Sequence, residues 1–389
     1  MKIGIITHYY RSQNYGGTLQ AYALCFFLKG KGYAAEQIQF DRNKDIGLIP
    51  NLRTAYHKLR ELPSSLHLEP KYKRVHQLMR ERAGKFEAFR NDAIPHSAQV
   101  FSPKTIKYLP PNYDVFIAGS DQVWHPSAVC DAYLLKLGTE KSIKISYAAS
   151  VATDVLSAYD QARYQAAFSD FQAISVRESN AIELIQPLSP TKVEWVLDPT
   201  LLLVKNDWDE ICAERMVNQP YLFCYFLGAD IEERELAKAY AKRKGLKLVT
   251  MPFLLREMLL QRDFRKYESS FGDEQLYDVS PEHFLSLIKY ASCVFTDSFH
   301  AALFSGVFRR EYFIFGRGEM NSRITSLTKL YETEERFCNT PERRTIEYIL
   351  AQKPIDYTRE LTLLHDMQQK SKDFLKDNLE KAERQLNGI

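Results

Sequence analysis

Short apolar segments alternate with helical stretches along most of this chain, and this pattern constrains its fold more than any other feature. The sequence opens with an apolar strand at Ile3–Thr7, a helix at Thr18–Lys29 and a second strand at Ala34–Phe40. Strands joined by helices form parallel sheets that helices cover on both faces. We therefore predict an α/β fold of Rossmann-like units, which bind ligands at the carboxyl ends of their strands.

The pattern divides the 389 residues into two such units and a closing helix. We predict an N-terminal Rossmann-like domain over residues 1–205, with a helical insertion at about 42–110, and a C-terminal Rossmann-like domain over 206–355. Residues 356–389 are expected to form a helix that crosses back to the N-terminal domain. A hydrophobic content of 45% is enough for two cores. The two domains are expected to face a central cleft.

The charged residues and cysteines exclude several classes of protein. Lys and Arg number 52 against 49 Asp and Glu, and they are dispersed, so nothing indicates nucleic-acid binding. The six cysteines form no CxxC pair, and the histidines form no HxH or HExxH set, so we predict reduced core cysteines and no metal site. The chain enters a strand directly and has no apolar run that could span a bilayer. We expect a cytoplasmic protein, with peripheral association at the inner face of the membrane left open.

Glycines lie between the first strand and the first helix, in Asn14-Tyr15-Gly16-Gly17. They would let the backbone approach a ligand, and the start of the helix could hold a phosphate or carboxylate. The competing interpretation is a tight turn with Thr18 as the helix cap. The spacing does not match a dinucleotide-binding motif.

Two further strands end in polar residues that would face the same crevice. Ser120 and Asp121 follow the first of them, and Asp121 could orient an acceptor hydroxyl or cap a helix. Arg177 follows the second, where a guanidinium suits bidentate capture of carboxylate or phosphate, although a surface pair with Glu178 is the alternative. Asp198, which precedes a proline, is interpreted as a residue that shapes a turn.

The segment Thr296–Ser305 passes from an apolar strand into a helix whose first turn carries His300. Asp297 and Ser298 precede this histidine. An imidazole at such a point could exchange protons near neutral pH. Arg317 and Arg323 follow the next strand and could complete a pocket for an anion.

These motifs together resemble the polysaccharide pyruvyl transferase family. The resemblance covers nearly the whole chain, and its motifs occur in the family's order: Asn14–Gly17, Gly119–Trp124, Ser175–Glu178, Asp198–Leu202 and Thr296–His300. It implies the two-lobed GT-B-like fold of many glycosyltransferases. It also implies that a pyruvyl group moves from phosphoenolpyruvate onto two hydroxyls of a sugar, which forms a cyclic ketal and releases phosphate. The acceptor would be a lipid-linked or nucleotide-linked precursor of a surface polysaccharide, with phosphoenolpyruvate as co-substrate and no cofactor.

The resemblance also implies roles for individual residues. His300 matches the family's histidine, a proton donor or phosphate ligand, and Asp121 would position or deprotonate the acceptor. Phosphoenolpyruvate is a trianion, which Arg177, Arg323 and the helix start near Ser298 would bind. Some family members carry an arginine where this chain has Ser298, which leaves Arg317 or Arg323 to substitute.

Two other functions fit the same fold. One is a GT-B glycosyltransferase that uses a nucleotide sugar, although no nucleotide pocket is identified in the sequence. The other is a non-catalytic binding protein of a glycan pathway.

Overall fold

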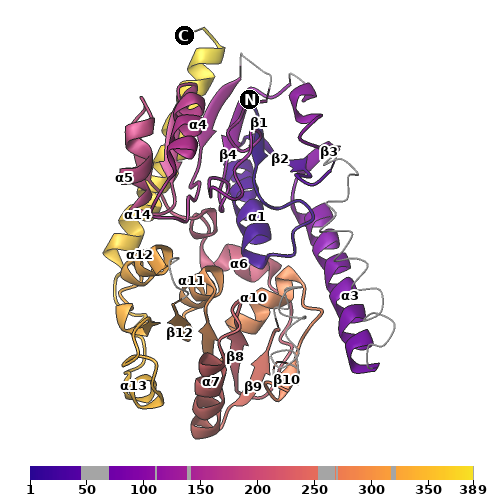
Figure 1. Ribbon diagram of the computed structural model, residues 1–389, viewed down its shortest axis with the longest axis vertical. Helices are drawn as coiled ribbons and strands as arrows, with labels where there is room; N and C mark the ends of the chain where they lie inside the picture. Colours follow the sequence, from indigo (N-terminus) through magenta and orange to yellow (C-terminus); the bar gives the residue numbers. More distant parts are fainter. Residues whose placement is uncertain are drawn as a thin grey trace.

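The computed structural model describes residues 1–44, 70–109, 112–137, 142–252, 268, 270–316 and 321–388. Two parallel sheets, each packed with helices, lie one beyond the other along the longest axis of the molecule (Figure 1). We call the sheet of β1–β7 with its helices the first lobe, and the sheet of β8–β13 with its helices the second lobe. The predicted α/β fold of two Rossmann-like units is confirmed.

The described part of the first sheet has seven strands, all parallel, in the order β3-β2-β1-β4-β5-β6-β7. Their bounds are β1 Lys2–Ile6, β2 Ala34–Phe40, β3 His96–Phe101, β4 Val115–Ala118, β5 Ile143–Ser146, β6 Phe171–Val176 and β7 Val193–Trp195. The helices around it are α1 Tyr15–Gly30, α3 Pro70–Ala93, η1 Ile106–Tyr108, α4 Ala158–Phe168, α5 Ala181–Ile185, η2 Gln186–Leu188, η3 Pro199–Leu201 and α6 Lys205–Ile211.

The second sheet has six described strands, again all parallel, in the order β10-β9-β8-β11-β12-β13. Their bounds are β8 Tyr221–Tyr225, β9 Lys247–Thr250, β10 Glu274–Gln275, β11 Cys293–Thr296, β12 Glu311–Phe315 and β13 Phe337–Cys338. The helices that follow or cover them are α7 Ile231–Lys244, α10 Pro281–Lys289, α11 Phe299–Val307, α12 Ser322–Leu330, η5 Glu334–Arg336 and α13 Ile346–Ala351.

The last helix, α14 (Thr362–Leu386), returns to the first lobe, so that both chain ends lie at the same end of the molecule (Figure 1). The Ser371 hydroxyl accepts a hydrogen bond from the backbone N–H of Leu197 at 2.9 Å. Gln172 of β6 donates to the carbonyl of Asn378 at 3.0 Å. The chain therefore crosses between the lobes twice, before β8 and before α14.

The segment 42–110 differs in part from the predicted helical insertion. The helical character of the insertion is confirmed by α3. His96–Phe101, however, is the edge strand β3, and the backbone N–H of Gln37 in β2 donates to the carbonyl of Pro95 at 2.8 Å. Its short polar sequence resembles a loop, and it becomes a strand because β2 offers unpaired backbone groups. Residues 45–69 and 110–111 of the insertion lie outside the described residues.

An apolar core joins the lobes. Tyr15 of α1 stacks on Phe284 of α10, with ring centroids 4.5 Å apart, and its hydroxyl donates to the carbonyl of Val279 at 2.7 Å. Trp208 of α6 meets Phe304 of α11 edge-on at 4.8 Å. Burial of aromatic rings on both sides fixes α1 against α10 and α6 against α11.

All six cysteines are free, and four of them (Cys25, Cys224, Cys293 and Cys338) are buried. Across the described ranges, no helix is both long and apolar enough to cross a membrane.

Candidate active site

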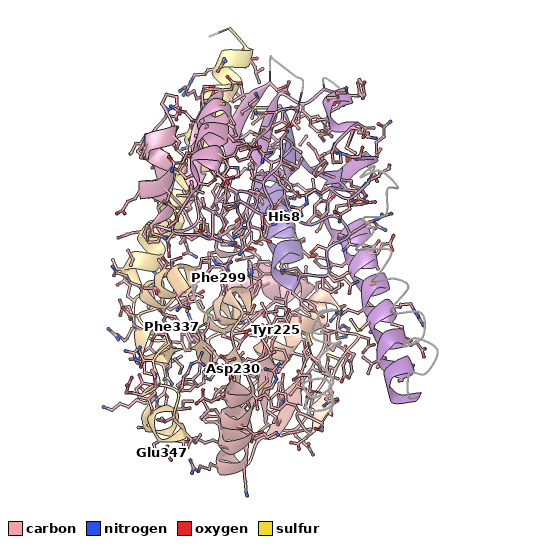
Figure 2. All side chains as sticks on the ribbon, viewed as in Figure 1. His8, Tyr225, Asp230, Phe299, Phe337 and Glu347 are labelled. Carbon is pink, nitrogen blue, oxygen red and sulfur yellow. The ribbon has the colours of Figure 1, made fainter. Side chains whose placement is uncertain are left out.

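A cavity of about 790 Å³ lies between the two lobes. The first lobe supplies the segments after β1 and β2, the start of α1, and Asp121 and Gln122 after β4. The second lobe supplies residues after β8 and β11 and the start of α12. Figure 2 shows His8 of the first lobe above Phe299 and Tyr225 of the second. The cavity therefore occupies the carboxyl edges of both sheets, where α/β proteins bind ligands.

The first turns of α1 and α11 meet at this cavity. Asn14 caps α1 by accepting a hydrogen bond from the N–H of Gly17 at 3.1 Å, so Asn14, and not Thr18, is the cap. Ser298 caps α11 by accepting from the N–H of Ala301 at 3.5 Å. A Cβ atom on Gly16 would lie only 1.9 Å from Nδ1 of His300. Glycine is therefore required at position 16, and the positive ends of two helix dipoles face one space.

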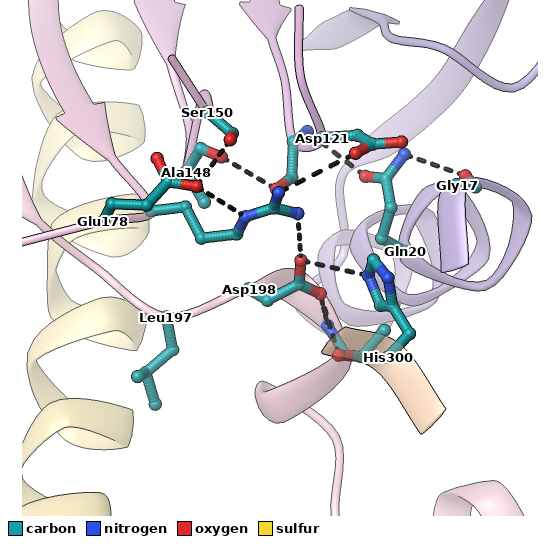
Figure 3. Close-up of polar contacts among 12 residues, drawn as sticks. Gly17, Gln20, Asp121, Ala148, Ser150, Glu178, Leu197, Asp198 and His300 are labelled. Atoms are coloured by element: carbon teal, nitrogen blue, oxygen red, sulfur yellow. Dashed lines mark hydrogen bonds and ion pairs between the residues drawn. The ribbon is translucent and has the colours of Figure 1, made fainter. Parts of the chain in front are cut away.

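His300 lies against a buried carboxylate, that of Asp198 (Figure 3). Nε2 of His300 is 3.5 Å from Oδ2 of Asp198, and the same oxygen accepts a hydrogen bond from Arg177 at 2.9 Å. The other oxygen accepts from the N–H and hydroxyl of Thr200 at 3.0 and 2.8 Å. Burial alone would raise the pKa of Asp198, but His300 and Arg177 outweigh burial and hold the pKa below its ordinary value.

Arg177 is buried beneath the cavity and does not line it, contrary to the expectation that it would bind an anion directly. Its guanidinium lies between three carboxylates: Asp198 at 2.9 Å, Glu178 at 3.4 Å and Asp121 at 3.8 Å. Burial lowers its pKa, but the carboxylates more than offset this and raise it. The positive charge of Arg177 is thus balanced by carboxylates within the protein.

Asp121 lines the cavity as expected, with its side chain 15% exposed. Its φ is 66°, in the left-handed region, which aspartate tolerates better than most residues. A Cβ atom on Gly17 would lie 3.1 Å from Oδ2 of Asp121 and 2.9 Å from the carbonyl oxygen of His8. The absence of a side chain at Gly17 therefore leaves room for this carboxylate beside α1.

Three other predicted site residues make contacts within the protein. Ser120 is fully buried and donates to the carbonyl of Ala148 at 2.8 Å, away from the cavity. Tyr15 touches the cavity, but its hydroxyl joins the lobes. Asp297 accepts from the N–H groups of Leu227 and Gly228 at 2.6 and 2.7 Å and so holds the segment after β8 at the cavity wall.

Arg323 at the start of α12 lines the cavity, as expected, and its guanidinium lies 5.8 Å from the ring centroid of Phe299. The side-chain amide of Gln122 is best oriented with its oxygen toward Arg323. In this orientation the oxygen accepts hydrogen bonds from the two terminal nitrogens of Arg323 at 3.2 and 3.3 Å. This contact links the lobes across the cavity. Arg317 lies outside the described residues.

Several cavity residues were not anticipated from the sequence. His8 follows β1, and its ring contacts the Gln122 carbonyl at 3.2 Å and the Tyr133 hydroxyl at 3.1 Å. Burial lowers its pKa. Arg42 follows β2 and donates to the carbonyl of Ala128 at 2.8 Å. His8 directly follows a predicted strand and Arg42 lies two residues after one, and these positions could have identified them.

In the part of the chain that the structure describes, no cluster of three or more His, Cys, Asp or Glu side chains is arranged to hold a metal ion. The side chains at the cavity instead suit an anion and proton transfer. They combine imidazoles, guanidiniums and carboxylates with the starts of two helices.

Comparisons with known proteins agree with this geometry. No curated protein matches the chain. A putative UDP-N-acetylglucosamine 2-epimerase from Listeria monocytogenes superposes with a TM-score of 0.50 at 10% identity, covering 95% of this chain and 90% of that one. MnaA of S. aureus, solved with UDP, gives 0.50 at 10% identity, covering 100% and 98%. These structures share the two-lobed GT-B-type fold, as predicted.

The family model of the polysaccharide pyruvyl transferases matches residues 14–317. The matched range includes the start of α1, Asp121, Arg177, Asp198 and His300. The chain therefore belongs to the polysaccharide pyruvyl transferase family.

Proposed function

We propose that this protein transfers the pyruvyl group of phosphoenolpyruvate to two hydroxyls of a sugar and releases phosphate. The observation that carries the proposal is the meeting of the first turns of α1 and α11 around His300, inside a cavity that both lobes line. The acceptor would be a lipid-linked or nucleotide-linked precursor of a surface polysaccharide, modified in the cytoplasm at the inner face of the membrane.

The donor site would be the space at the two helix starts. The first N–H groups of a helix have no partner within the helix, and they point toward a bound anion. Arg323 adds a guanidinium from the same side as His300. This set of donors fits the carboxylate and phosphate of phosphoenolpyruvate, and it makes up for the arginine that other members carry where this chain has Ser298.

The reaction needs one acid and one base at opposite sides of the reacting carbon. His300 in its charged form gives a proton to the methylene carbon. The first sugar hydroxyl then bonds to C2 as its proton passes to Asp121. Next, phosphate leaves C2 with the electron pair of the C–O bond. The second hydroxyl bonds to C2 and returns its proton to His300, while the proton on Asp121 leaves with phosphate. Both residues line the cavity and are restored after each turnover.

The size of the cavity supports a second substrate. Pockets for small ligands commonly range from about 300 to 1,000 Å³. About 790 Å³ leaves room for a sugar beside phosphoenolpyruvate. His8, Tyr133 and Gln122 form the wall of the first lobe near Asp121, and they offer an aromatic ring and polar groups of the kind that bind sugars.

The glycosyltransferase alternative has less support. In the described part of the second lobe, Arg323 lines the cavity, but Arg344 and Arg234 near the carboxyl edge of the sheet are engaged by that lobe. Arg344 pairs with Asp230 and Glu233 at 2.9 and 3.1 Å, and Arg234 pairs with Glu268 at 2.6 Å. None of these residues lines the cavity. A nucleoside diphosphate that bound to Arg344 or Arg234 would have to displace the carboxylates paired with them.

The test is release of phosphate from phosphoenolpyruvate in the presence of lipid-linked, nucleotide-linked and free saccharides, with the ketal product identified by mass spectrometry. We expect phosphate release that depends on one class of acceptor and is lost in His300→Gln. His365→Gln is the matched control, because His365 is exposed on α14. Thermal stabilisation by UDP and not by phosphoenolpyruvate, without phosphate release, would contradict the proposal.

A further inference from the structure

We infer that Asp198 is a positioning residue that holds the His300 ring with Nε2 turned inward, so that Nδ1 is the nitrogen that exchanges protons with substrate. The orientation follows from the geometry of the unliganded protein. Its catalytic consequence rests on the proposed pyruvyl transfer. Asp198 was interpreted from the sequence only as a residue that shapes a turn.

The carboxylate of Asp198 is fixed from two sides. Its side chain is fully buried, and one oxygen is held by the N–H and hydroxyl of Thr200 at 3.0 and 2.8 Å. The other oxygen accepts from Arg177 at 2.9 Å. With both oxygens anchored, the carboxylate presents a fixed lone pair to the imidazole. Arg177 also keeps Asp198 ionised, so Asp198 accepts a hydrogen bond without taking the proton.

The imidazole is fixed on its other edge by α1. A Cβ atom on Gly16 would lie 1.9 Å from Nδ1, 2.3 Å from Cγ and 2.5 Å from Cε1. This edge of the ring is therefore in contact with the backbone of α1, while Nε2 faces Asp198 at 3.5 Å. Gly16 and His300 both line the cavity. The ring is clamped between the two groups, and Nε2 is fully buried, which leaves Nδ1 as the nitrogen that a ligand in the cavity could reach.

This clamp selects one tautomer. A carboxylate only accepts, so the neutral imidazole is expected to carry its proton on Nε2, which leaves the lone pair of Nδ1 at the cavity. The 3.5 Å contact is long for a hydrogen bond, and such contacts in unliganded sites often tighten in the complex. In the charged ring, Nδ1 carries the proton that goes to the methylene carbon, and Nε2 keeps its own throughout.

The first measurement is the side-chain ¹⁵N spectrum of protein labelled at histidine, with His300 assigned by its loss in His300→Gln. We expect Nε2–H for the neutral form in the wild-type protein. Asp198→Asn should lose this preference, because an amide can either donate or accept. Its kcat should fall about 10²- to 10⁴-fold, with KM for phosphoenolpyruvate much less affected.

The control is Asp114→Asn, which makes the same change at a carboxylate beside β4 that accepts from the N–H of Lys2 at 2.7 Å. It should change neither the tautomer nor kcat. A neutral wild-type ring protonated at Nδ1 would overturn the inference even if Asp198→Asn fails to fold. An Asp198→Asn variant with the wild-type tautomer and kcat would overturn it as well. The ¹⁵N spectrum needs no substrate, so it tests the tautomer of His300 independently of pyruvyl transfer. Failure of the proposed function would show only in the phosphate assay.

Discussion

The two lobes each bury arginine among carboxylates at the carboxyl edge of a sheet, but they use these charges differently. In the first lobe, Arg177 is surrounded by Asp121, Glu178 and Asp198, which we call the Arg177 cluster. Two of its carboxylates connect the cluster to the ligand site: Asp198 contacts His300, and Asp121 lines the cavity. The charges of this cluster are therefore connected to the ligand site.

In the second lobe, the corresponding charged residues form ion pairs with residues of the same lobe. We call Arg344, Arg234, Asp230, Glu233 and Glu268 the Arg344 cluster. Arg344 also donates to the carbonyl of Gly316 at 2.8 Å, and no member of the cluster lines the cavity. Similar ionic groups thus reach the cavity in one lobe and are paired within the fold in the other, so only the first set is placed to take part in the proposed reaction.

The largest effect is expected where the Arg177 cluster meets the second lobe. His300→Ala removes the proposed proton donor, so kcat should fall about 10²- to 10⁴-fold. Binding of phosphoenolpyruvate should survive, because the helix starts and Arg323 remain. Single-turnover phosphate release measures the loss of rate, and calorimetry measures the binding of phosphoenolpyruvate. Full activity in this variant would break the comparison between the clusters.

A large loss of rate is also expected when the His300 ring is displaced by a substitution at a neighbouring residue. Gly16→Ala places a Cβ atom 1.9 Å from Nδ1 of His300, so the ring must leave its contact with Asp198. Misplacement of about 1 Å can cost 10²-fold in rate, and kcat should fall by about that factor.

Gly30→Ala, at the end of the same helix, has nothing within 4 Å of the added atom. It should keep kcat and raise the unfolding free energy by up to about 1 kcal/mol. Equal losses of kcat in both variants would show that α1 is merely sensitive to substitution.

A moderate effect on stability, not on rate, is expected in the Arg344 cluster. Burial and the carboxylates of Asp297 and Asp230 raise the pKa of Glu233 from 4.5 to about 8, against the opposing effect of Arg344. Between these values the folded protein holds a proton that the unfolded chain has lost, so the unfolding free energy falls as pH rises from 4.5 to 8.

Glu233→Gln removes this titration. Between pH 5 and pH 8, the wild-type protein should lose about 3.5 kcal/mol more than the variant in urea unfolding. Parallel pH profiles for the two proteins would contradict the assignment. A fall in kcat comparable to that of His300→Ala would show that the Arg344 cluster serves chemistry too.

The smallest effect is expected at the contact between the lobes. Tyr15→Phe removes the hydrogen bond to the carbonyl of Val279 and keeps the ring stacked on Phe284. The unfolding free energy should fall by about 1 kcal/mol. Denaturant titration measures this loss. No loss at all would mean that ring packing alone joins α1 to the second lobe.

The fold could be predicted because each strand and helix carries its own local pattern. The strand Cys293–Thr296, for example, is apolar and ends at a polar turn before a helix, and both elements are present. The edge strand His96–Phe101 was missed, because its sequence is short and polar and its structure depends on pairing with β2. Pairing between distant segments leaves little trace in a single sequence.

The position of His300 and Asp121 at the cavity was predictable, because each lies in the polar segment after a strand, but the network between them was not. Asp198 and His300 are about a hundred positions apart, and nothing near Asp198 indicates a histidine partner. For Arg177, the sequence reveals the cation but not that three carboxylates surround it. Whether a charge is available to a ligand depends on its neighbours in space.

His300 belongs to one lobe, whereas Gly16 and Asp198, which hold its ring, belong to the other. A hinge opening that separates α1 from α11 would therefore disconnect the imidazole from its counter-ion before any substrate leaves. In the proposed reaction, the acid would be assembled only while the two lobes are in contact.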